Sequence, residues 1–93
     1  MTASAIVEDI GPLLTELKRL GVVEIASSYD AEHFGDYYVD LRGPTGSFRI
    51  TRDRSQYILF GDDERLKSMG LFRAFDSRDQ FHDAALRYAQ AVV

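Results

Sequence analysis

The stretch DYYVDLRGPTGSFRITRDRSQYILF, residues 36–60, decides the fold because many of its apolar residues recur at every second position. A period of two is typical of a β-strand that buries one face, and clustered glycine and proline mark the turns between strands. We therefore predict three consecutive strands in this stretch, joined by two tight turns. The strands cover residues 36–42, 47–52 and 57–60, and the turns cover residues 43–46 and 53–56.

The alternation also predicts a register for these strands. Antiparallel pairing across the first turn brings apolar residues opposite apolar ones and opposite charges together. The pairs are Arg42 with Ser47, Leu41 with Phe48, Asp40 with Arg49, and Val39 with Ile50. Each cross-strand pair contributes about 0.2–1 kcal/mol, and a slip of one residue would lose these matches together. The same reasoning at the second turn predicts the pairs Ile50 with Leu59 and Thr51 with Ile58.

Helical patterns flank the three strands. Apolar residues three and four apart predict one helix over residues 4–20, kinked at Gly11-Pro12 and ended by Gly21. A strand with Val23, Ile25 and Tyr29 on one face is predicted over residues 22–29. After the last strand we expect one or two helical turns at 62–70 and an irregular apolar connection at 71–75. A final helix should then begin at a capping box formed by Ser77 and Gln80.

The element order is therefore α-β-β-β-β-α. Each terminal helix has a single apolar stripe, and the simplest arrangement places both helices on one face of the sheet. We predict an α+β, two-layer sandwich: a four-stranded antiparallel β-meander with the N- and C-terminal helices on one face. The chain is expected to form a single domain over residues 1–93, with Val39, Leu41, Phe48, Ile50 and Leu59 in its core.

Composition excludes several classes of protein. The net charge of −4 argues against a general nucleic-acid binder, and the absence of cysteine excludes disulfides and thiolate zinc sites. The first residues, MTASAIVEDIGPLL, lack the basic region of a signal peptide, and no apolar run is long enough to cross a bilayer. We expect a cytoplasmic protein that does not engage a membrane.

The sequence offers weak candidates for catalysis. His33 and His82 have no motif partner, and we interpret both as ordinary surface histidines. The acidic run at residues 62–64 lacks the spacing of a calcium loop, and acid in a first helical turn is explained by the helix dipole. We predict no enzyme, no metal and no cofactor. An enzyme or ligand-binding domain would instead show a concave pocket in which a histidine meets a carboxylate.

The second face of the sheet is the predicted binding site. Tyrosine and arginine beside exposed apolar residues are typical of protein interfaces. The residues that we expect to bind another protein, or a second copy of this chain, are Tyr38, Arg42, Arg49, Arg52, Arg54, Ile58 and Phe60. In one alternative, residues 62–75 fold back over this face. In another, the arginines and tyrosines bind single-stranded nucleic acid, unless Asp36, Asp40 and Asp53 neutralise them.

The stretch FGDYYVDLRGPTGSFRITRDRSQYILFG, followed by GLFRAF, resembles small immunity proteins of bacterial polymorphic-toxin and contact-dependent inhibition systems. The resemblance covers residues 34–75. It implies a protein that binds a cognate toxin domain and blocks it. The chain is also similar to the secretion chaperones, which join helices to a meander, and that similarity implies a homodimer.

Overall fold

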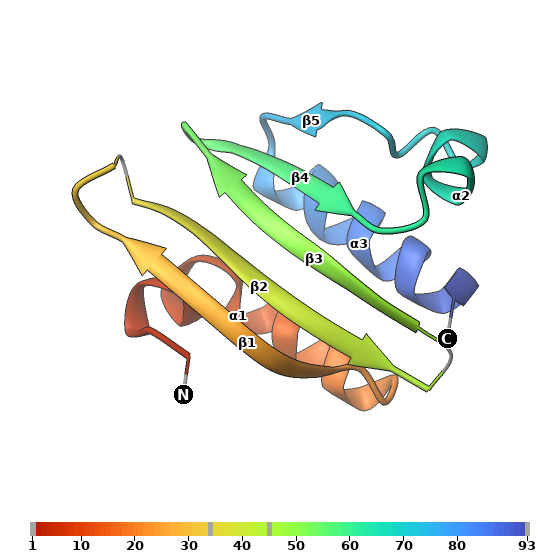
Figure 1. The fold of residues 1–93 in the computed structure, drawn as a ribbon, viewed down its shortest axis with the longest axis horizontal. Helices are drawn as coiled ribbons and strands as arrows, with labels where there is room; N and C mark the ends of the chain where they lie inside the picture. The colour runs from red at the N-terminus through yellow and green to blue at the C-terminus, as the bar shows by residue number, and fades with distance from the viewer. Residues whose placement is uncertain (1, 34, 45, 93) are drawn as a thin grey trace.

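The computed structural model describes residues 2–33, 35–44 and 46–92. Its centre is an antiparallel sheet in which each strand pairs with the next one along the chain (Figure 1). Thr45, in the first predicted turn, lies outside the described residues. The strands are β1 (Val23–Asp30), β2 (Asp36–Gly43), β3 (Gly46–Asp53), β4 (Gln56–Phe60) and β5 (Ala74–Phe75).

The predicted register of the meander is confirmed. Leu41 pairs with Phe48, Asp40 with Arg49, and Val39 with Ile50. Ile50 also pairs with Leu59, and Thr51 pairs with Ile58. The five residues predicted to form the core of the sheet, Val39, Leu41, Phe48, Ile50 and Leu59, are all buried.

Two helices cover one face of this sheet. Helix α1 (Ser4–Arg19) and helix α3 (Arg78–Val92) lie side by side behind the strands in Figure 1. The predicted kink in α1 is present: Ile10 has non-helical angles, φ −126° and ψ 20°. Pro12 explains it, because proline has no N–H to donate and its ring clashes with the preceding turn. Gly21, with φ +84°, adopts the left-handed conformation expected just after the helix.

The predicted strand count is wrong. The sheet has five strands, because Ala74 and Phe75 of the segment expected to be irregular pair with Ile58 and Tyr57 of β4. Phe75 points to the helix side and meets Phe81 of α3 edge to face, with ring centroids 5.8 Å apart. A strand of two residues is too short to show an alternation of period two, so periodicity could not reveal it.

The segment 62–75 does not cover the second face of the sheet. After a short helix, α2 (Asp63–Ser68), which lies near the end of β4 in Figure 1, the chain runs along the sheet edge into β5. Its apolar side chains Leu66, Leu71 and Phe75 join the core cluster that also contains the residues of α1 and α3. The alternative in which this segment folds back over the second face is therefore wrong.

The predicted face of β1 is also wrong. The pairing of β1 with β2 shifts between Glu24 and Ala26, which is a β-bulge. A bulge inserts one extra residue and changes which side chains point inward. As a result Val23 lies opposite the exposed Arg42 and Tyr29 lies opposite the buried Tyr37, so the residues predicted to share one face are divided between the two; Val23, Ile25 and Tyr29 are 46%, 49% and 39% exposed. No helix within the described ranges is long and apolar enough to cross a membrane.

Candidate functional site

We call the sheet face opposite α1 and α3 the open face. The strand pairing places its side chains in rows that run across the sheet. One row holds Tyr38, Thr51 and Ile58, and the next holds Asp40, Arg49 and Phe60. Arg42 and Ser47 form the third row. The register predicted from the sequence therefore brings Tyr38, Arg49, Ile58 and Phe60 together on one surface.

Arg49 is the most constrained side chain of the open face. Its Nε and Nη2 donate hydrogen bonds of 2.6 and 3.0 Å to the two oxygens of Asp40. Its guanidinium carbon also lies 4.1 Å from the centre of the Tyr38 ring. The Arg49 hydrogen bonds hold the pKa of the Asp40 carboxyl below its usual value. Arg49 is thus held in one orientation with its side chain still 45% exposed.

Apolar surface adjoins this arginine. Phe60 follows Arg49 in the same row and is 50% exposed, and Ile58 in the neighbouring row is half-buried. Both belong to β4, whose other large side chains, Tyr57 and Leu59, point into the core. Of the four consecutive large apolar residues in this strand, two therefore stabilise the core and two face outward.

The other predicted arginines lie in different environments. Arg42 is exposed on the open face, in the row beyond Asp40. Arg54 lies in the turn after β3 with φ +52°, and its backbone N–H donates to the Asp36 carboxylate at 2.9 Å. Arg52 is on the opposite face, paired with Tyr37 and Tyr57, because it lies three positions after Arg49, and an odd offset along a strand changes the face. Its inclusion in an open-face site was therefore wrong.

Arg52 belongs to a polar cluster that the sequence analysis missed. Asp9 of α1 accepts hydrogen bonds from the hydroxyls of Tyr37 (2.7 Å) and Tyr57 (2.9 and 3.0 Å). Arg52 Nε lies 3.9 Å and Arg78 Nη1 lies 3.5 Å from its carboxylate. One sequence signal could have revealed it: Asp9 lies three residues after Ile6 and four before Leu13, on the buried stripe of its helix.

The tyrosines of this cluster are shifted in their acidity. Burial, together with the smaller effect of the hydrogen bond to Asp9, raises the pKa of Tyr57 to about 12. The pKa of Tyr37 is raised by the same two causes, with burial the larger. Neither phenol is therefore activated as a base or nucleophile near neutral pH, and the geometry is that of a brace that ties α1 to β2 and β4.

A pH dependence of stability follows from these two phenols. Because folding raises their pKa values above the unfolded value of about 10, the folded chain binds more protons than the unfolded chain above that pH. The two tyrosines should therefore contribute fully to the free energy of unfolding below pH ~10. This contribution should be lost as the pH rises toward ~12. Urea unfolding across this range should show a steeper decline for the parent than for Tyr57→Phe. Equal declines would contradict the assignment.

Both histidines meet carboxylates. His33 Nδ1 lies 2.6 Å from Asp30 Oδ2 in an exposed loop, and this contact lowers the pKa of Asp30. His82 on α3 hydrogen-bonds Glu16 on α1 and is half-buried rather than on the exposed surface. It borders a cavity of about 350 Å³ whose lining also contains Asp9 and Arg78 and includes no serine, threonine, cysteine or tyrosine. A His–carboxylate pair beside a cavity is part of the geometry expected for a ligand-binding domain.

Within residues 2–33, 35–44 and 46–92, no group of three or more His, Cys, Asp or Glu residues is placed to hold a metal ion. No protein-family model, curated protein or solved structure matches this chain.

Proposed function

We propose that this chain is a non-enzymatic protein-binding domain that docks its partner on the open face. The observation that carries the proposal is the arrangement of Arg49, stacked over Tyr38 and hydrogen-bonded to Asp40, beside the half-exposed Phe60. A two-layer sandwich with helices on one face leaves these residues in contact with solvent.

The physical chemistry of interfaces supports this assignment. Tyrosine and arginine are enriched where binding energy concentrates, and a ring of polar residues usually surrounds the apolar centre. Arg49 is already oriented by Asp40 and Tyr38, so less side-chain entropy is lost when a partner immobilises it. Phe60 and Ile58 supply apolar area next to it.

The partner that we propose is a toxin domain, which the chain would bind and neutralise in the bacterial cytoplasm. This choice rests on the resemblance of residues 34–75 to immunity proteins. The rival within the same class is a homodimer formed through the open face, as the similarity to secretion chaperones implies. Nucleic acid is disfavoured because Arg52 lies on the other face and Arg49 is engaged by Asp40. If no salt-dependent oligonucleotide binding is measured at low ionic strength, nucleic acid is excluded as the partner.

The experiment is a paired substitution on the open face. Arg49→Ala combined with Phe60→Ala should weaken binding to a cognate toxin domain, or self-association, about thirtyfold, since two truncations of contact residues at ~1 kcal/mol each sum to ~2 kcal/mol. Calorimetric titration measures binding to the toxin domain, and sedimentation equilibrium measures self-association. The matched control is Phe72→Ala with Arg65→Ala, which removes an equally exposed phenylalanine and an exposed arginine elsewhere. Unchanged association in the open-face variant would exclude this face.

A second candidate, a ligand-binding domain, is favoured by the His82–Glu16 pair beside the cavity between α1 and α3. It predicts that a small-molecule fragment library yields ligands that shift the NMR signals of His82, Asp9 and Arg78. Those shifts should be lost in His82→Ala. If no fragment perturbs these signals, this candidate is excluded.

A further inference from the structure

The sheet has one long free edge. Strand β1 lies at the outside of the strand order with eight residues, whereas the opposite edge strand β5 has only two. In Figure 1, α1 lies behind β1, and among the described residues no further strand pairs with the outer side of β1. An edge strand presents backbone N–H and C=O groups on its outer side, and these groups can pair with another extended chain.

The side chains of β1 do little to block such pairing. Natural edge strands are commonly protected by lysine, proline or charges that point inward. The charged residues of β1 are Glu24 and Asp30, and the five residues between them, IASSY, carry no charge and no proline. The bulge at Glu24 and Ala26 and the inward-facing Glu24 protect the first part of this strand, whereas Ala26–Asp30 beyond them pair regularly with β2.

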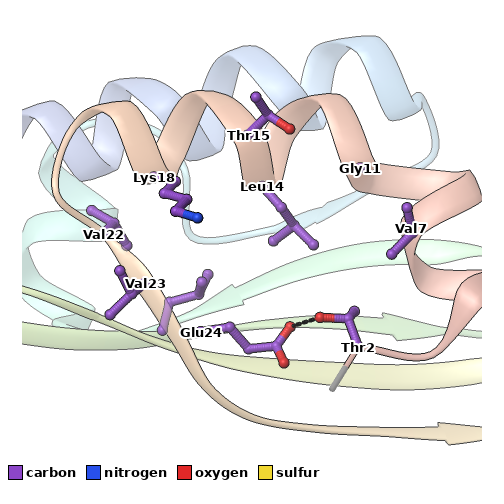
Figure 2. Close-up of a pocket in the computed structure, with 10 residues that line it drawn as sticks. Thr2, Val7, Gly11, Leu14, Thr15, Lys18, Val22, Val23 and Glu24 are labelled. Carbon is purple, nitrogen blue, oxygen red and sulfur yellow. Dashed lines mark hydrogen bonds between the residues drawn. The ribbon is translucent and has the colours of Figure 1, made fainter.

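An apolar groove runs between this edge strand and α1. Its volume is about 430 Å³, and Figure 2 shows Leu14 and Lys18 extending from the helix toward Val23 and Glu24 of the strand. Gly11 widens the helix side, because a Cβ there would lie only 3.3 Å from Val7 Cγ1. Val7 and Val23 on its walls are about half exposed, and buried Val22 and Leu41 form its floor.

The polar residues of the groove define the charge that it would accept. Glu24, the acid in the lining, already accepts a hydrogen bond from the Thr2 hydroxyl. Lys18 is exposed on the rim, and within the described ranges it makes no ion pair. The groove is thus apolar in the middle with a cation at one end, which complements an apolar side chain next to a carboxylate.

We propose that an extended segment of a partner protein adds to β1 as a further strand, seats an apolar side chain between α1 and β1, and presents an acidic side chain or terminal carboxylate to Lys18. In this mode of recognition, main-chain hydrogen bonds to the edge give affinity and the pocket for alternate side chains gives specificity. The site is separate from the open face and does not depend on the function proposed above.

The test uses three short fluorescein-labelled peptides and the whole chain. The first peptide alternates valine and threonine and ends in two aspartates, the second ends in two lysines, and the third carries proline at alternate positions. We expect the aspartate peptide to bind, by fluorescence anisotropy, at least tenfold more tightly than the other two. It should also slow amide hydrogen exchange in residues 23–30.

Variants locate the binding. Val23→Lys and Lys18→Glu alter exposed residues of the groove and should weaken binding of the aspartate peptide at least tenfold. Thermal melting should confirm that each variant is folded. Phe60→Lys, an equally exposed apolar residue on the open face, is the matched control and should bind as the parent does.

Four results would overturn the proposal: no binding by any of the peptides, equal binding of the proline or lysine peptide, weaker binding in Phe60→Lys but not in Val23→Lys, or amide protection outside β1. Concentration-dependent dimerisation of the protein alone that Val23→Lys abolishes would show that a second copy occupies the edge, and would overturn it as well.

Discussion

Replacing Asp9 by alanine is expected to lower the free energy of unfolding by about 2–4 kcal/mol, because a nearly buried carboxylate would leave several partners without an acceptor. The side chain is 17% exposed and accepts hydrogen bonds from Tyr37 and Tyr57. Among the described residues, the buried Arg52 Nε has no hydrogen-bond partner, and the Asp9 carboxylate 3.9 Å away is the charge that compensates it. Removing Asp9 leaves two phenols without their acceptor and Arg52 without its nearby opposite charge on the inner face of the sheet.

Urea unfolding of the parent, Asp9→Ala and Asp9→Asn measures this effect. The asparagine variant keeps an accepting oxygen and loses the charge, so its destabilisation should fall between the other two. Glu8→Ala is the matched control, since Glu8 is the exposed acid next to Asp9 on the same helix, and a change within about 0.5 kcal/mol is expected. Equal effects of Asp9→Ala and Glu8→Ala would mean that the cluster does not brace the fold.

The meander could be read from the sequence because each strand buries one face, and a period of two then fixes both the face and the register. The pairs Asp40 with Arg49 and Val39 with Ile50 were predictable on this basis. Local patterns fail where the chain departs from regular pairing. The bulge in β1 puts Val23 and Tyr29 on opposite faces, and β5 is held by its pairing with β4 and by the contact of Phe75 with Phe81 rather than by any pattern of its own.

The candidate site was predictable to the same extent. Tyr38, Arg49, Ile58 and Phe60 share a face because the strand period places them there. Arg52 was grouped with them by charge alone, although the same period assigns it to the helix side. The cluster around Asp9 joins α1, β2, β3 and β4, and only the packing of α1 on the sheet brings these residues together. Side-chain chemistry that depends on packing between elements is not visible in local sequence.

Replacing Gly61 by alanine is expected to destabilise the fold by about 2–3 kcal/mol, through a close approach rather than through backbone conformation. A Cβ at this position would overlap the Tyr88 hydroxyl and lie 3.1 Å from Tyr88 Cζ and 3.3 Å from Phe48 Cβ. Tyr88 is 2% exposed and packs edge to face on Phe48, so its ring has little room to move. Its hydroxyl accepts the backbone N–H of Asp62 at 2.8 Å, and displacing the ring would break that bond as well.

The matched control is Gly46→Ala, because a Cβ at Gly46 would meet nothing within 4 Å. Its expected change in unfolding free energy is small, which separates the steric effect from the general cost of replacing a glycine. Tyr88→Phe removes the bond to Asp62 and relieves the overlap with the hydroxyl oxygen. In the Tyr88→Phe background, Gly61→Ala should therefore cost less than in the parent, and this coupling is measurable as a double-mutant cycle. Additive costs in that cycle would show that Gly61 is needed for a reason other than its contact with Tyr88.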